Sequence, residues 1–337
     1  MSAALRRCAV VAVLAAGCAG GGEATSTTDD NVDSDRATAV ETIADSVIAP
    51  AYHDLSQRSA GALDSARSLC AIPNDENLDS ARRAISAAYD SYLRLDPIDF
   101  GPLMDLRAAS QLGYRPDPDR IDALLADNPP VDAVTVGTRL PASARGFGAA
   151  EHLVASDLAE FTGAGTARPT PRCAYLIAVL EQASIVVASI HTGWFRAQPP
   201  FAEQVAGRGR DPIPTKEVID ILVNMTLEAL GADSVALAAE ARDGTVAPEF
   251  VRIATRHLET IAEIWGTRTE QRRLRATVGA DLAERVAVEL DVALAAARRG
   301  DATATLSAVD AVRATVGTEV VAALDVVVGF SENDGDS

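Results

Sequence analysis

The chain has 337 residues, of which 48 are acidic and 30 basic, so its formal net charge at pH 7 is −18. This balance argues against a nucleic-acid partner, because a nucleic-acid-binding protein needs a basic face for the phosphates. With only four cysteines and four histidines, the chain also lacks the closely spaced ligands of a structural zinc site.

Residues 1–18 have the features of a bacterial export signal. Arg6 and Arg7 precede an apolar run, residues 8–16, that is too short to span a membrane as a helix. The run leads into Leu-Ala-Ala-Gly-Cys, which resembles a lipobox and predicts cleavage before Cys18 and a lipid on that cysteine. A plain secretory signal is the alternative.

Residues 19–37 are rich in Gly, Thr and Asp and have no apolar periodicity, so we expect a disordered tether. With a lipidated Cys18, this tether would hold a folded part at the membrane. That part would face the periplasm or the exterior of a bacterial cell envelope.

The rest of the chain predicts an all-α fold, because apolar residues recur at three- and four-residue steps and no alternating strand pattern persists. The clearest break is the Pro- and Gly-rich stretch 196–214. We therefore predict two tandem helical bundles of the four-helix type, over residues 38–196 and 212–330. The expected helices are 40–69 (interrupted or bent at Pro50), 78–95, 118–125, 146–158 and 175–194, and then 215–242, 248–265, 270–299 and 301–328.

Cys70 and Cys173 are the two cysteines outside the signal. Two cysteines in an exported protein are expected to pair. Such a disulfide would join the end of the first long helix to a later helix.

Residues 145–153, Arg-Gly-Phe-Gly-Ala-Ala-Glu-His-Leu, combine an acid, an imidazole and two glycines in an otherwise alanine-rich helical chain. On a helix Gly148 and Glu151 share a face. The bare backbone at Gly146 and Gly148 would let another helix or a ligand come close. A close helix crossing with a solvated Glu151 and His152 is the simpler interpretation, and a ligand site is the functional one.

Several segments in series resemble the imelysin family of exported bacterial proteins. The resemblance is carried by residues 47–52, 69–73, 78–82, 99–102 (Asp-Phe-Gly-Pro), 112–117, 145–153 and 172–176. It implies an all-α, two-bundle fold with a site near the interface of the halves. It also implies a role connected with iron, haem or another metal, and a peptidase activity has been claimed for some members.

The chain departs from the family at the site segment. Some members have Gly-x-His-x-x-Glu, in which the His and Glu lie one helical turn apart as potential metal ligands. Here Gly148 stands in the His position and Glu151 remains. His152 points about 100° around the helix from Glu151, so it joins the same site only in a cleft with two walls.

The candidate metal- or ligand-binding residues are therefore Glu151, His152, Arg145, His53 and Asp99. For His53 a surface position, for Asp99 a turn cap and for Arg145 a structural ion pair are the alternatives. The sequence contains neither the Gly-x-Ser-x-Gly motif of serine hydrolases nor the His-Glu-x-x-His motif of zinc proteases.

Three functions remain after these exclusions. The first is a membrane-tethered, non-catalytic binding protein in the uptake of iron, haem or another divalent metal, working with proteins of an uptake system. The second is a metallopeptidase, which the missing histidine disfavours. The third is a structural or interaction lipoprotein whose ancestral site has decayed.

Overall fold

The computed structural model describes residues 26–127, 131–162, 170–243, 248–266 and 273–329. Within these ranges all regular structure is helical and no strand is present, which confirms the all-α prediction. The signal segment and its Cys18 lie outside the described residues.

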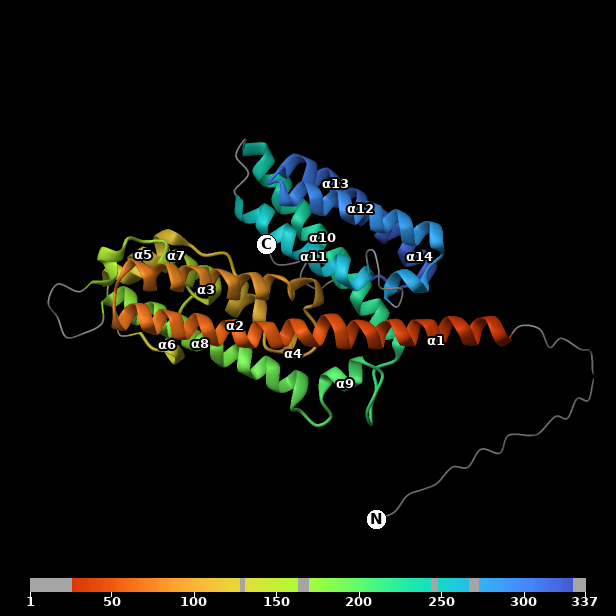
Figure 1. Ribbon diagram of the computed structural model, residues 1–337, viewed down its shortest axis with the longest axis horizontal. Coiled ribbons are helices and arrows are strands. Elements are labelled where there is room, and N and C mark those ends of the chain that lie inside the picture. Colours follow the sequence, from red (N-terminus) through yellow and green to blue (C-terminus); the bar gives the residue numbers. More distant parts are fainter. Residues whose placement is uncertain (1–25, 128–130, 163–169, 244–247, 267–272, 330–337) are drawn as a thin grey trace, which may run out of the picture.

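The first long helix is continuous across the predicted interruption. It is formed by α1 (Ser26–Ile43), a π-helical turn (Ala44–Ile48) and α2 (Ala49–Ala71), which run end to end along the molecule (Figure 1). Pro50 lies in the first turn of α2. Because proline has no N–H and its ring crowds the carbonyl of the preceding turn, a wider π-helical turn there accommodates it without ending the helix.

The start of α1 corrects the expected tether. Residues 26–37 are helical rather than disordered. Ala39, Val40 and Ile43 are buried, so the core anchors the helix at this point. Extending a helix that the core already anchors needs no new nucleation, so the weakly amphipathic residues 26–37 can join it. Residues 19–25 of the expected tether are outside the described residues.

The N-terminal group of helices surrounds α2. Helices α3 (Asp75–Leu93) and α8 (Pro171–Phe195) pack on α2, and α7 (Gly146–Val154) packs on both α3 and α8. Helix α8 is apolar over most of its circumference because it lies in the middle of this group. The shorter helices are α4 (Pro102–Asp105), α5 (Pro118–Asp127) and α6 (Ala133–Arg139).

The predicted disulfide is confirmed. Cys70 at the end of α2 is bonded to Cys173 in the first turn of α8, with 5.6 Å between their Cα atoms. It joins two helices 103 residues apart in the sequence.

The C-terminal group begins after α9 (Phe201–Val205), which lies in the predicted junction. Its helices are α10 (Thr215–Asp243), α11 (Pro248–Trp265), α12 (Ala280–Arg298), α13 (Ala302–Thr315) and α14 (Val321–Leu324), with a π-helical turn (Val316–Val320) between the last two. The helix predicted from residue 270 begins only at Ala280. A 3-10 turn (Leu274–Thr277) and extended backbone at Val278 and Gly279 precede it. The apolar periodicity before Ala280 therefore belongs to this turn and not to the helix.

The two groups share one core. Helix α11 contacts α3, and α10 contacts α1. The buried apolar side chains of both groups form a single contiguous cluster. The C-terminal helices gather on one side of the long α1–α2 helix (Figure 1), and a division into two independent bundles remains a prediction.

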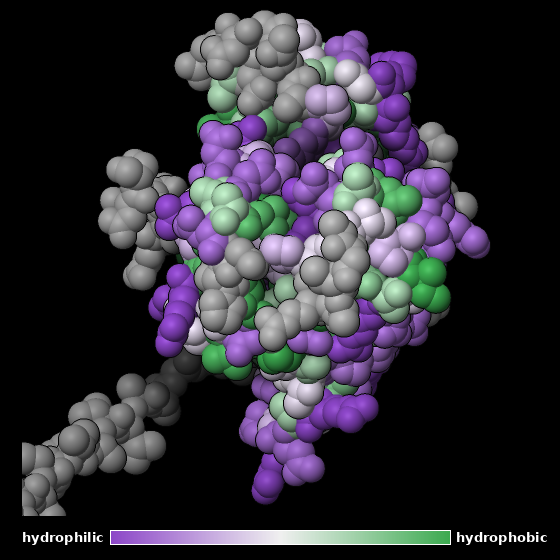
Figure 2. Space-filling view, turned by 90° about the vertical axis from the view of Figure 1, so that its left-hand side faces the viewer, coloured by the Kyte–Doolittle hydropathy of each residue, from purple (hydrophilic) through white to green (hydrophobic). Residues whose placement is uncertain are grey.

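Two helices of the described chain, Pro171–Phe195 and the stretch Thr215–Ala239, are long and apolar enough to cross a membrane by length and composition. Of the most apolar window, 61% is buried in the first and 39% in the second. The first is therefore explained as a core helix, and the second has an apolar face that the core does not cover. The end of the molecule near α5 and α7 is mostly hydrophilic, with small separate hydrophobic areas (Figure 2).

Candidate functional site

Helix α7 presents the site segment, and its two glycines let the chain's own backbone approach. Gly146 has φ +78°, and a Cβ there would lie 2.5 Å from the carbonyl oxygen of Leu112. A Cβ on Gly148 would lie 2.9 Å from Pro116 Cδ and 3.3 Å from the carbonyl oxygen of Tyr114. The close approach predicted from sequence is therefore made by residues 111–116. A histidine at position 148 would need this segment to move.

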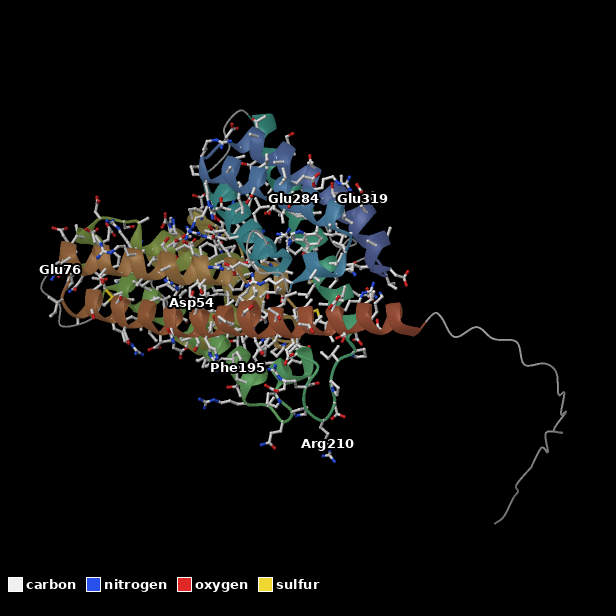
Figure 3. The ribbon with its side chains drawn as sticks, turned by 45° about the vertical axis from the view of Figure 1, so that its right-hand side comes forward. Asp54, Glu76, Phe195, Arg210, Glu284 and Glu319 are labelled. Atoms are coloured by element: carbon white, nitrogen blue, oxygen red, sulfur yellow. A yellow bond between two sulfur atoms is a disulfide. The ribbon has the colours of Figure 1, made fainter. Side chains whose placement is uncertain are left out.

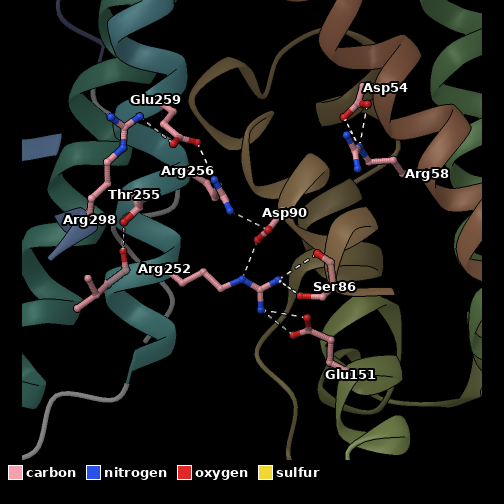
Figure 4. Close-up of polar contacts among 11 residues, drawn as sticks. Asp54, Arg58, Ser86, Asp90, Glu151, Arg252, Thr255, Arg256, Glu259 and Arg298 are labelled. Atoms are coloured by element: carbon pink, nitrogen blue, oxygen red, sulfur yellow. Dashed lines mark hydrogen bonds and ion pairs between the residues drawn. The ribbon is translucent and has the colours of Figure 1, made fainter. Parts of the chain in front are cut away.

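Glu151 is held by an arginine of the other half of the chain. Nη1 of Arg252, on α11, donates to both carboxylate oxygens of Glu151 at 3.0 Å (Figure 4). The same guanidinium donates through Nε to Asp90 at 2.7 Å and through Nη2 to the backbone oxygen and hydroxyl of Ser86. Its Cζ lies 5.3 Å from the centre of the Tyr89 ring, within the range of a cation–π contact. All three of its nitrogens are engaged.

This ion-pair network continues along α11. Arg256 donates to the second oxygen of Asp90 at 2.9 Å and to Glu259 at 2.8 Å. Arg298 donates to the other oxygen of Glu259 at 3.1 Å (Figure 4). With Arg252 and Glu151, the network pairs three arginines with three carboxylates, so it carries no net charge.

The electrostatics favour this closed arrangement. Burial alone would lower the pKa of Arg252, but Glu151 and Asp90 raise it above its ordinary value. The side chains of Arg252 and Glu151 are 28% and 27% exposed, so the pair is screened less than a surface pair. Arg252 therefore stays charged, and Glu151 keeps a permanent counter-ion.

His152 does not join Glu151. Its Nε2 lies 3.2 Å from Oδ1 of Asp122 on α5, whereas Glu151 faces α3 and α11. This divergence agrees with the angle expected between consecutive helical residues. The two candidates of the site segment therefore face different neighbours.

Within the described part of the chain, Arg145 pairs neither with Glu151 nor with another carboxylate. Its Nε donates to the backbone oxygen of Ser110 at 3.1 Å and its Nη1 to that of Gly137 at 2.7 Å. Arg145 thus ties the start of α7 to two neighbouring segments. The ion pair considered from the sequence is replaced by these backbone hydrogen bonds.

His53 lies on α2, outside the network, and meets a second histidine. Its Nδ1 is 3.0 Å from Nε2 of His191 on α8. Its ring stacks on Phe195 with 4.2 Å between centroids, at the end of α8 (Figure 3). Burial and the neighbouring His53 lower the pKa of His191, which favours the neutral form of the His191 ring.

Asp99 follows a 3-10 turn (Asp96–Ile98) between α3 and α4. Its Oδ1 is buried and accepts no hydrogen bond from a described residue. Burial, followed by the negative charges of Asp96 and Glu228, raises the pKa of Asp99 to about 7. The expected turn cap is therefore not its role, since its carboxyl caps nothing in the described chain.

A second buried charge cluster is centred on a histidine of α11, and its partners were not predicted from the sequence. His257, on α11, lies between Asp233 (Nδ1 to Oδ1, 3.0 Å) and Asp96 (Nε2 to Oδ2, 3.2 Å). Burial alone would lower the pKa of His257, but the two carboxylates raise it to about 10. The imidazolium therefore links α10, α11 and the turn after α3. The apolar periodicity of residues 248–265 predicts the helix that carries His257 and Glu263. No pattern in the sequence indicates that the distant Asp96 and Asp233 lie against His257.

The donors around Glu151 do not fit a metal ion. Both of its oxygens are on Arg252, and His152 faces away. Among the described residues no group of three or more His, Cys, Asp or Glu side chains is arranged to hold a metal. A transition metal with one carboxylate, already paired with an arginine, would lack the three or four ligands it needs.

Comparison with known proteins places this geometry in a family. The model of the imelysin family (Peptidase_M75) matches residues 48–325. A search of the curated proteins found no match.

Two solved structures share the fold. An imelysin-like protein from Psychrobacter arcticum 273-4 has a TM-score of 0.69 at 16% identity, over 88% of this chain and 98% of that one. A protein from Parabacteroides distasonis ATCC 8503, named "putative iron-regulated protein A precursor", has a TM-score of 0.66 at 15% identity, over 85% of this chain and 94% of that one. With the family model covering most of the sequence, this chain belongs to the imelysin family.

Proposed function

We propose that this protein is a non-catalytic binding protein of the bacterial cell envelope, held at the membrane by a lipid on Cys18, that serves the uptake of iron, haem or another metal. The observation that carries the non-catalytic part is the contact of Arg252 with both oxygens of Glu151. Metal-dependent hydrolysis needs a bound metal with an open coordination position and a general base. The segment that carries these groups in some relatives is here an internal ion pair.

The link to metal uptake is supported by the family and by the iron-regulated neighbour from Parabacteroides distasonis. The export signal of residues 1–18 supports the location. Because the Glu151 region does not fit a bare ion, we propose that the cargo is a chelate such as haem, or a metal-loaded partner of an uptake system.

One observation favours a second function, an interaction lipoprotein without metal cargo. Gly148 occupies the family's histidine position, and Pro116 fills the space of its missing side chain. If the ancestral ligand site has been lost in evolution, other residues of the chain are expected to fill its space, as Pro116 does here.

Calorimetry and elemental analysis of the mature chain with Fe²⁺, Fe³⁺, Zn²⁺ and haem test the proposal. The variants are Glu151→Gln and, as a matched exposed control, Glu319→Gln. We expect haem or a chelate to bind wild type and both variants equally, and bare ions to bind none of them. Metal-dependent peptide cleavage that Glu151→Gln abolishes would overturn the non-catalytic assignment. No binding of any cargo would leave the interaction lipoprotein as the function.

A further inference from the structure

A long groove, separate from the Glu151 network, runs along α10. It has a volume of about 1080 Å³ and is lined along α10 from Glu217 to Ala236. It is bordered by the corner that carries Asp99 and Met104, by α9, by α13 and by the chain after α14. None of the residues of the Glu151 network lines it. We call it the α10 groove.

Helix α10 has two apolar faces, and the core covers only one of them. Its inner face, which includes Ile219, Leu222 and Leu230, is fully buried. A second apolar face, which includes Ile221, Met225 and Val235, lines the groove. Val235 is 70% exposed, and Met104 across the groove is 59% exposed. Such a contiguous exposed apolar lining is typical of an interaction site.

The groove also contains a carboxyl group that has no hydrogen-bond partner among the described residues. Asp99 lies in its lining, its Oδ1 is buried without a hydrogen bond, and the charges that act on it, Asp96 and Glu228, are both negative. A buried polar atom without a partner costs roughly 1–3 kcal/mol. A cation brought into the groove would offset the negative charge of the Asp99 carboxylate.

The charges of the lining are mainly negative. Glu217 and Asp220 line the groove with Asp99, against the single arginine Arg313 among the described lining residues. Lys216 offsets Asp220, at 2.6 Å. The electrostatic complement of this surface is therefore a positively charged one.

The dimensions of the groove point to a peptide rather than a small molecule. Nineteen steps along a helix, from Glu217 to Ala236, span about 28 Å. A helix of this length, about 10 Å wide, would lie along the groove from Glu217 to Ala236. A small-molecule site encloses its ligand on most sides, which an open groove of this length does not.

From this combination we infer that the α10 groove binds an amphipathic, basic helical segment of a partner protein. The apolar face of the segment packs on Ile221, Met225 and Val235, and one of its lysines or arginines reaches the carboxyl of Asp99. This is helix-in-groove recognition, with apolar anchors at three- and four-residue steps. An anionic membrane is a poor alternative occupant, because the carboxylates of the lining would repel it.

The test uses the mature chain and a synthetic helical peptide of about 18 residues, with leucines on one face and lysines along its edges. A second peptide has every lysine replaced by glutamate. Binding is measured by fluorescence anisotropy at about 0.3 M salt, where general attraction to an acidic chain is screened. The variants are Asp99→Asn and Val235→Lys, with Asp105→Asn as a control, since Asp105 is an exposed carboxyl on the same corner that does not line the groove.

We expect the lysine peptide to bind wild type and Asp105→Asn equally, and Asp99→Asn and Val235→Lys at least about fivefold more weakly, a change of roughly 1 kcal/mol. The glutamate peptide should not bind. Lack of binding by the lysine peptide, or equal binding to all four proteins, would overturn the inference. Displacement of the peptide by spermidine at a similar concentration would also overturn it, in favour of a small-cation site. Because Glu151 is untouched, a failure here leaves the proposed function standing.

Discussion

Replacing Arg252 with methionine tests whether the ion-pair network fastens the two halves of the chain. The change removes five hydrogen bonds to Glu151, Asp90 and Ser86 while keeping most of the apolar stem. Asp90 keeps Arg256 as a partner, whereas Glu151 is left as an unpaired, largely buried carboxylate.

The magnitude follows from the burial of the pair. Exposed ion pairs contribute about 0–1 kcal/mol, and breaking a buried pair costs about 3–5 kcal/mol. At roughly a quarter exposed, the pair of Arg252 and Glu151 lies between these limits, so we expect a loss of about 2–3 kcal/mol. For about 300 residues that unfold together, with about 2 cal/mol/K of entropy each, this lowers Tm by roughly 3–5 °C.

The assay is urea unfolding of wild type, Arg252→Met, Glu151→Gln and the double variant. We expect a coupling energy of about 1–2 kcal/mol between the two substitutions. The control is Arg285→Met, because Arg285 and its partner Glu319 (labelled in Figure 3) have side chains that are 50% and 49% exposed. This substitution should cost less than about 1 kcal/mol. A loss for Arg252→Met no larger than that of the control, or strict additivity in the cycle, would refute the reasoning.

Three further outcomes follow from the described contacts. Replacing both Cys70 and Cys173 with alanine should lower the free energy of unfolding by about 2–5 kcal/mol, because their bond closes a loop of about a hundred residues in the unfolded chain; equal urea midpoints for the variant and the oxidised wild type would contradict this. The pKa of His257 is about 10, against 6.5 in the unfolded chain, so its charged ring stabilises the fold fully below pH 6.5 and this stabilisation is lost as pH rises through 10. Wild type should therefore lose more stability between pH 6.5 and pH 10 than His257→Gln. Parallel stability profiles of the two proteins would count against the contact of His257 with Asp233. The pKa of Asp99 is raised from 3.8 to about 7, so its ionisation opposes folding above pH 7. In urea unfolding, Asp99→Asn should therefore be more stable than wild type by roughly 1–4 kcal/mol at pH 8 and no different near pH 3.5. No gain in stability at pH 8 would exclude a buried Asp99 carboxyl without a partner.

Local features were predictable from the sequence because short-range physics sets them. Asp301 caps α13 by accepting from the N–H of Ala304, and Pro118 begins α5, both as their residue types favour. The disulfide followed from counting cysteines in an exported chain. The start of α1 was not predictable, because its helicity depends on a core that begins only at Ala39.

The candidate site was predictable only in part. The sequence predicted the close approach at Gly148, but it did not predict the ion pair of Glu151. Arg252 lies 101 residues from Glu151, and no local pattern selects it from the other arginines. Asp99 was given the role of a turn cap because turn propensity says nothing of the groove that α10 closes around it.

The helical start at Ser26 also determines how far the folded part could stand from a membrane. If Cys18 carries a lipid, eight peptide units join it to α1, and fully extended they reach about 28 Å. Between these residues and the first buried residue of the core, Ala39, α1 adds a stiff spacer about 20 Å long. Together these lengths limit the distance between the lipid and the core to about 50 Å, which keeps membrane-bound partners at a high effective concentration for the protein.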